Sequence, residues 1–159
     1  MRRRVAQRCN GKENRHNRDV LRKWGWAYTI GFLGIFIITH TPALTDAEGK
    51  NLGLFVIDPI DDVVHLLSGL VGLILVVFAP RHLPMYFIVI GVLYELDAIV
   101  GMTMSRGLLD LSVFRLGPGN PDFSLTNWAV NMPHIVLATL ALWIGFRYRG
   151  QPQRAAALA

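Results

Sequence analysis

The chain has 159 residues, of which 52% are hydrophobic and 17% charged, and its net charge is +5. Soluble domains carry about 25% charged residues, so this composition argues against an ordinary soluble domain. The basic residues are concentrated at the N-terminus, which argues against a nucleic-acid-binding surface spread over one face.

Residues 1–23 form a basic tail that holds nine of the 16 Lys and Arg residues. A basic segment directly before an apolar run is a topology signal, and it has affinity for anionic lipid headgroups. We therefore expect a cytoplasmic tail. The single cysteine of the chain, Cys9, lies in it, so no intramolecular disulfide supports the fold.

Four apolar runs follow the tail, at residues 24–41, 63–79, 83–104 and 128–146. Each is close to the roughly 17–25 residues that a helix needs to cross the hydrocarbon core. Because lipid offers no partner for backbone groups, we expect helices. Residues 24–147 are thus predicted to form a four-span membrane domain, and residues 148–159 a second cytoplasmic tail. A cleaved signal sequence is disfavoured, since no small-x-small pattern follows the first run.

The distribution of basic residues predicts the orientation. Thirteen of the 16 lie before residue 24, after residue 146, or in the turn between the second and third runs, and three lie in the loops 42–62 and 105–127. The positive-inside rule then places both termini in the cytoplasm, N-in and C-in, in the plasma or inner membrane. The predicted fold is all-α, a four-helix transmembrane bundle made of two tandem helical hairpins.

The two predicted hairpins resemble each other. The segment Asp62–His65 has a counterpart in Asn131–His134, and each His is followed by small residues four and seven positions later. Those positions share one helix face, and small residues allow close helix packing in lipid. An internal repeat with both histidines directed inward is therefore predicted. Pro133 is expected to start or kink the fourth helix.

The chain also resembles an uncharacterised bacterial family of small four-span membrane proteins, a domain of unknown function. The resemblance covers residues 25–147 and is carried by Asp61–Leu70, Gly91–Tyr94 and Asn127–His134, with Asp/Asn-x-x-His at the start of spans two and four. It departs from the family pattern at Glu95, Asp97 and Pro133. The resemblance implies the four-span fold and no particular reaction.

Eight polar side chains are expected in the outer half of the bundle: His40, Asp61, Asp62, His65, Glu95, Asp97, Asn131 and His134. A charge at the centre of a span costs roughly 2.5–3.5 kcal/mol, so ionisable residues there call for an explanation. By helical rise, His65 should lie about 5 Å and His134 about 9 Å below the outer ends of their spans. Asp62 is predicted to cap the second span. Glu95 and Asp97, two positions apart, cannot both face the interior.

Three functions are compatible with these residues. The preferred prediction is a non-catalytic scaffold or accessory subunit, in which the histidines donate hydrogen bonds across the bundle to Asn131, Asp97 or a backbone carbonyl. Such a protein has the lipid bilayer as its partner and acts as a homo-oligomer or within a larger membrane complex. The first alternative is a metal ion or haem held by His65 and His134, and the second is a proton-coupled carrier that uses Glu95 and Asp97. No catalytic residue and no resident cofactor are assigned.

Overall fold

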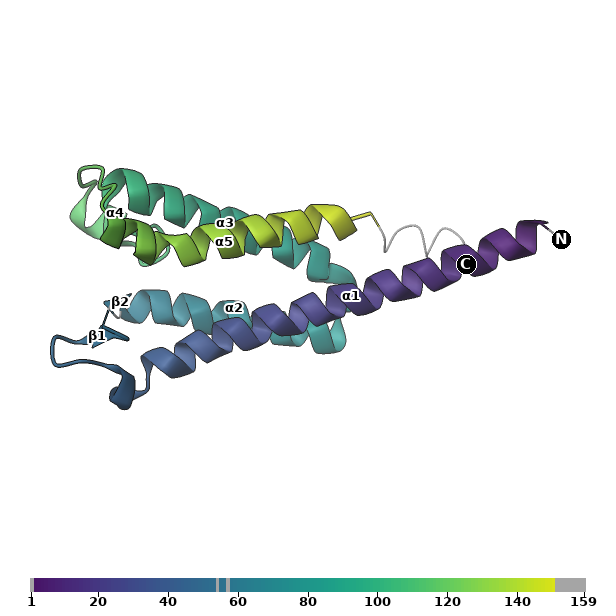
Figure 1. The fold of residues 1–159 in the computed structure, drawn as a ribbon, viewed down its shortest axis with the longest axis horizontal. Helices are drawn as coiled ribbons and strands as arrows, with labels where there is room; N and C mark the ends of the chain where they lie inside the picture. Colours follow the sequence, from purple (N-terminus) through teal and green to yellow (C-terminus); the bar gives the residue numbers. More distant parts are fainter. Residues whose placement is uncertain (1, 54, 57, 151–159) are drawn as a thin grey trace.

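The computed structural model describes residues 2–53, 55–56 and 58–150. Its long helices are α1 (Arg2–Thr39), α2 (Pro59–Phe78), α3 (Leu83–Met104) and α5 (Leu125–Tyr148). The shorter elements are η1 (Pro42–Leu44), η2 (Pro80–His82), α4 (Ser112–Leu116) and two strands, β1 (Lys50–Asn51) and β2 (Phe55–Val56), which pair antiparallel. The all-α prediction is confirmed (Figure 1).

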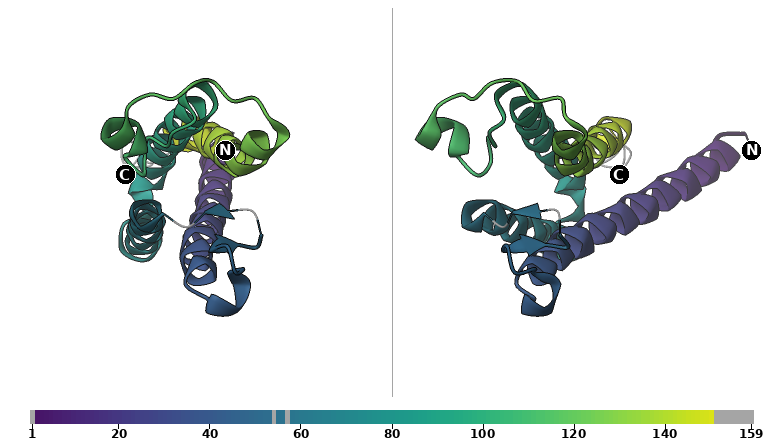
Figure 2. Two further views of the ribbon diagram at one scale, coloured as in Figure 1. Left: turned by 90° about the vertical axis from the view of Figure 1, so that its left-hand side faces the viewer. Right: turned by 60° about the vertical axis from the view of Figure 1, so that its left-hand side comes forward.

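The long helices associate in sequence-adjacent pairs. Helix α1 packs along α2 and α3 packs along α5, whereas contacts between the two pairs are much sparser. Figure 1 shows the loops that carry β1, β2 and α4 at one end, and α1 projecting beyond the other helices at the opposite end. The two views in Figure 2 show the same separation of the pairs. We call the end with α4 the loop end.

Three helices are long and apolar enough to cross a membrane, namely α2, α3 with the preceding η2 turn, and α5. Their outward faces carry exposed apolar side chains such as Val71, Ile74 and Ile99. A soluble protein rarely exposes so continuous an apolar surface, so these helices indicate an integral membrane protein. Helix α1 is not in this group, because Arg22 and Lys23 lower the mean hydropathy of its last 18 residues, 22–39.

Helix α2 starts four residues before the predicted span. Its N-cap is Asp58, whose carboxylate accepts hydrogen bonds from the backbone N–H groups of Ile60 and Asp61. Pro59 occupies the first helical position, where a missing N–H costs nothing. The prediction that Asp62 caps the helix was therefore wrong: Asp62 lies inside the first turns of α2 and is buried.

Helix α5 also begins earlier than the predicted 128–146. Ser124 is its N-cap and accepts a hydrogen bond from the N–H of Asn127. Pro133 lies well inside the helix, so it does not start it. Since proline has no N–H, the carbonyl of Ala129 one turn earlier loses its helical partner at this point.

The third predicted span, 83–104, coincides with α3, and α1 ends at Thr39, two residues before the expected end of the first span.

The small-residue faces of the even-numbered predicted spans point into the protein, as expected. Gly69, Gly72, Ala138 and Ala141 are all buried. A Cβ at Gly72 would lie 2.7 Å from the Thr29 hydroxyl and 2.9 Å from that of Tyr86. Neighbouring helices occupy the space directly beside these four positions, so only small residues fit there.

Hydrogen bonds from hydroxyl groups join the two helix pairs. Tyr28 of α1 donates to the backbone carbonyl of Leu137 in α5 at 2.7 Å. Tyr86 of α3 donates to the carbonyl of Ser68 in α2 at 3.0 Å, and the Ser68 hydroxyl lies 3.2 Å from that of Tyr94. With lipid around the helices, such bonds contribute modestly, about 0.6 kcal/mol each on average, but they fix how the pairs are aligned.

Candidate functional site

The imidazole of His134 is held by Asp97. Nδ1 of His134 lies 2.8 Å from Oδ2 of Asp97, and the two side chains are 19% and 8% exposed. A carboxylate can only accept, so Nδ1 carries the hydrogen and donates. The predicted hydrogen bond between these two residues is confirmed, and it leaves Nε2 of His134 without its hydrogen when the ring is neutral.

Asp97 also anchors the loop that follows α3. Its Oδ1 accepts the backbone N–H groups of Leu108 at 2.7 Å and Leu109 at 2.8 Å. The chain can fold back onto α3 because Ser105 and Leu111 adopt left-handed backbone conformations at either end of this loop. One buried carboxylate therefore fixes both a loop and the orientation of a histidine.

The second histidine is oriented by its own helix. Nδ1 of His65 donates to the backbone carbonyl of Asp61 at 2.9 Å, one turn earlier in α2. The prediction that His65 bonds across the bundle was wrong, because this carbonyl is within reach and needs no interhelical partner. The effect on the ring matches that in His134, since Nδ1 is again the donor and Nε2 is left with a free lone pair.

Three metal-ligand side chains converge at the loop end. One donor atom from each of Asp61, His65 and His134 lies within 4.8 Å of the others, and the two imidazole centroids are 5.9 Å apart. The depth estimates placed the two histidines only about 4 Å apart along the bundle, which is compatible with this convergence. Both helices start earlier than predicted, and the side chains reach toward each other across the gap between the helix pairs.

Aromatic packing holds the two rings in place. Tyr94 is fully buried and contacts both imidazoles edge-on, with centroids 5.8 Å from His65 and 5.2 Å from His134. Phe32 of α1 also packs against both Tyr94 and His65, with ring centroids at 5.2 and 6.0 Å. These contacts restrict rotation of the histidines and so pre-organise the donor atoms.

No protein-family model, curated protein or solved structure matches this chain.

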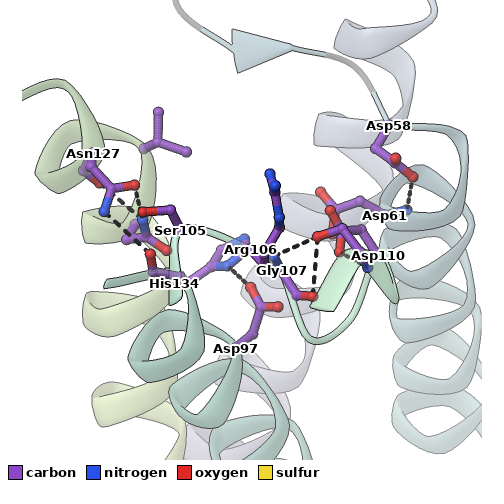
Figure 3. Close-up of a pocket in the computed structure, with 13 residues that line it drawn as sticks. Asp58, Asp61, Asp97, Ser105, Arg106, Gly107, Asp110, Asn127 and His134 are labelled. Atoms are coloured by element: carbon purple, nitrogen blue, oxygen red, sulfur yellow. Dashed lines mark hydrogen bonds and ion pairs between the residues drawn. The ribbon is translucent and has the colours of Figure 1, made fainter. Parts of the chain in front are cut away.

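A cavity of about 490 Å³ is lined by two of the three converging side chains, Asp61 and His134 (Figure 3). Its polar lining includes Asp58, Asp61, Asp97, Arg106, Asp110 and His134. The elements α2, α3 and α5 and the loop before α4 all contribute to it. Figure 3 shows the Arg106 side chain between the Asp97 side and the Asp61 side of this cavity.

The remaining predicted site residues lie outside the convergence point. Asn131 lines the cavity and donates to the carbonyl and the side-chain oxygen of Asn127 at 2.9 and 3.0 Å. Glu95 accepts a 3.3 Å hydrogen bond from Thr139 on the exposed side of the α3–α5 contact, so Asp97 is the member of that pair that faces inward. His40 lies 3.7 Å from Asp62 in a separate pair at the loop end.

Sequence reasoning missed Arg106, Asp110 and Ser68. Neither Arg106 nor Asp110 was among the predicted site residues, although both line the cavity. Asp110 accepts the N–H of Ser112 at 2.7 Å, a turn pattern that could have been recognised from the Asp-x-Ser spacing. The buried Tyr94 hydroxyl and its partner Ser68 had no comparable signal, because their pairing depends on how α2 and α3 pack.

Proposed function

We propose that this protein is a multi-pass membrane protein that binds one divalent transition-metal ion, Zn²⁺ fitting best, through Asp61, His65 and His134. The observation that carries the proposal is the convergence of one donor atom from each side chain within 4.8 Å. Nothing else in the described part of the chain supplies such a group of histidine and carboxylate donors.

The donor set is suited to zinc. Zn²⁺ takes imidazole nitrogen and carboxylate oxygen at about 2.0–2.2 Å, so tetrahedral ligands lie about 3.4 Å apart. The observed spread of up to 4.8 Å must shrink on binding, and Asp61, whose side chain is 33% exposed, has room to move. Three donors around one point favour a small ion over a haem, whose axial ligands lie on opposite faces of a large flat ring.

The hydrogen bonds made by the other ring nitrogen of each histidine support the same assignment. Metal-bound histidines commonly donate their other ring nitrogen to a carboxylate or a backbone carbonyl, which fixes the tautomer. His134 does so to Asp97 and His65 does so to the Asp61 carbonyl. Both rings therefore present Nε2 as the metal-binding nitrogen in our proposal. Three protein ligands leave a fourth position open for water or another small ligand.

We also propose that residues 24–39 of α1 form a fourth span and that both termini are cytoplasmic. The positive-inside bias supports this orientation, and the pairing of α1 with α2 supports the span. The metal site then lies at the outer face of the plasma or inner membrane. The relationship to the uncharacterised four-span family remains part of this proposal, carried by the same His65 and His134 segments.

The scaffold and carrier functions remain predictions. A metal ion between α2 and α5 would join the two helix pairs and is compatible with an accessory subunit that has no catalytic activity. A carrier that uses Glu95 together with Asp97 is less favoured, because the two carboxylates face different sides of α3.

The proposal is tested with the full-length protein purified in mild detergent and stripped of metal. Titration with Zn²⁺ should give one site per chain, and Co²⁺ should give the visible spectrum of a low-coordinate nitrogen and oxygen site. His65→Ala and His134→Ala should each weaken Zn²⁺ binding by at least about tenfold. The matched control is His82→Ala, a histidine in the η2 turn at the opposite end. Equal affinity in all three variants, or no binding by the wild type, would refute the site.

A further inference from the structure

The loop after α3 turns back along that helix before it crosses to α5. Oδ1 of Asp97 accepts the backbone N–H groups of Leu108 and Leu109 at 2.7 and 2.8 Å. Asp97 lies seven residues before Met104, the last residue of α3, which is about 10 Å along the helix axis. An aspartate side chain is much shorter than this distance, so Leu108 and Leu109 lie below the end of α3. We call residues 106–116, which include α4, the re-entrant segment.

The chain returns to the end of α3 after α4. The N–H of Gly119 donates to the carbonyl of Met104 at 2.8 Å. Within the re-entrant segment, the N–H of Val113 donates to the carbonyl of Gly107 at 3.1 Å. The segment is thus a compact loop that leaves and rejoins the protein at one level and lies alongside the last turns of α3.

The re-entrant segment is polar on one side and apolar on the other. Four of its residues line the cavity (Figure 3): Arg106, Gly107, Asp110 and Ser112. Leu111 and Phe114 do not line it, and they are 45% and 72% exposed. The side chains of Asp110 and Ser112 therefore belong to the wall of the cavity, whereas those of Leu111 and Phe114 form the outer side of the same segment.

The outer side of the segment lies at the level of the lipid-facing surface of α3. Ile99, two positions after Asp97, is 51% exposed on α3, so this apolar surface reaches the level at which Asp97 holds the segment. Both views in Figure 2 show α4 at the edge of the molecule. Irregular backbone is tolerated at membrane depth where it lines a water-filled cavity, as this segment does. Acyl chains stabilise an apolar surface at that depth, whereas its exposure to water would be costly.

We propose that the re-entrant segment lies within the lipid leaflet at the loop end, with Leu111 and Phe114 in contact with acyl chains. Its polar side then separates the charged lining of the cavity from lipid. Arg115 is exposed on the same helix, and its long side chain reaches the headgroup phosphates. Leu116 is the last residue before the chain returns to the end of α3, so it lies nearest to water. The proposal requires neither a bound metal nor a particular orientation in the membrane.

Nitroxide spin labels on single cysteines test this contact in the full-length protein. Cys9→Ser removes the native thiol, and Leu111→Cys or Phe114→Cys then supplies one labelling site. The labelled protein is reconstituted into liposomes of phosphatidylcholine and phosphatidylglycerol. Power saturation measures how often the label collides with oxygen, which concentrates in lipid, and with a water-soluble nickel chelate. Ile99→Cys is the matched lipid-facing control, and Glu48→Cys, exposed in the loop after η1, is the water-facing control.

The label at position 114 should collide more often with oxygen than with the chelate, as the label at position 99 does, and the label at position 48 should show the reverse. The label at position 111 repeats the test in case the change at Phe114 disturbs α4. Collisions dominated by the chelate at both positions would place the segment in water and overturn the proposal. Few collisions with either reagent and an immobilised spectrum would mean that another protein surface, such as a second copy, covers α4, which also overturns it. No zinc enters the measurement, so its result leaves the proposed metal site untouched.

Discussion

Replacing Asp97 by Asn should separate the two tasks of this residue. In the wild type, Oδ1 accepts two backbone N–H groups from the loop, and Oδ2 accepts Nδ1–H of His134. Asparagine has one oxygen and one NH₂ group. If its oxygen keeps the two loop bonds, its NH₂ faces His134, which must then move its hydrogen from Nδ1 to Nε2.

That change of tautomer removes the lone pair with which His134 is proposed to bind the metal. Loss of a carboxylate that accepts a hydrogen bond from a metal-bound histidine typically lowers metal affinity by about 10–100-fold. The loop should suffer less, because both backbone N–H groups keep an acceptor. In Asp97→Ala the same two groups lose theirs, at about 1–3 kcal/mol each, so about 2–6 kcal/mol of stability should be lost.

Two assays measure these effects. Competition with a chromophoric chelator gives the affinity for Zn²⁺, and thermal unfolding of the metal-free protein in detergent gives the stability. Asp97→Asn should bind zinc about 10–100-fold more weakly while unfolding closer to the wild type than Asp97→Ala does. Wild-type zinc affinity in Asp97→Asn would refute the orienting role, and equal destabilisation of the two variants would refute the loop role.

Three further predictions concern packing, capping and topology. Gly101→Ala should destabilise the protein by about 1–3 kcal/mol, because a Cβ at this position would overlap a neighbouring amide oxygen. Gly31→Ala should not destabilise it, because the space beside Gly31 is open. Chemical unfolding measures the stability of both variants. Asp58→Ala should cost about 1 kcal/mol through loss of the α2 cap and Asp58→Asn much less, measured in the same way. In intact cells a membrane-impermeant maleimide should label Leu116→Cys in a Cys9→Ser chain, and should label wild-type Cys9 only after the membrane is opened.

Each of these has a contrary outcome. Equal unfolding of the two glycine variants would mean that α3 and α5 do not approach closely at Gly101. Identical stability of the alanine and asparagine variants at Asp58 would mean that the side chain does not cap α2. Labelling of Cys9 in intact cells would show that the N-terminus lies outside. The metal site would then lie on the cytoplasmic side.

The apolar runs predicted most of the helical structure. The predicted bounds of α3 agreed with the structure because charged and proline residues lie close to both ends of that apolar run. The buried faces of α2 and α5 were predicted from the small residues Gly69, Gly72, Ala138 and Ala141. The helix starts were misplaced because hydropathy detects where apolar residues begin. The helices themselves begin at the polar caps Asp58 and Ser124, outside the apolar run.

The site was only partly predictable for a related reason. Its polar residues could be chosen from the spans, and the pairing of Asp97 with His134 was among the expected bonds. The convergence of His134 with Asp61 depends on side-chain directions and on the spacing of the two helix pairs. An estimate of depth along one helix gives neither of these. The position of Arg106 beside the cavity depends on a loop that folds back onto Asp97, a contact with no local sequence pattern.

X-ray absorption at the zinc edge tests the metal site most directly, on the full-length protein loaded with one equivalent of Zn²⁺. We predict a first shell of nitrogen and oxygen at about 2.0–2.2 Å, with outer-shell scattering from two imidazoles that falls to one in His134→Ala. A six-coordinate shell of oxygens alone, unchanged in that variant, would contradict the site.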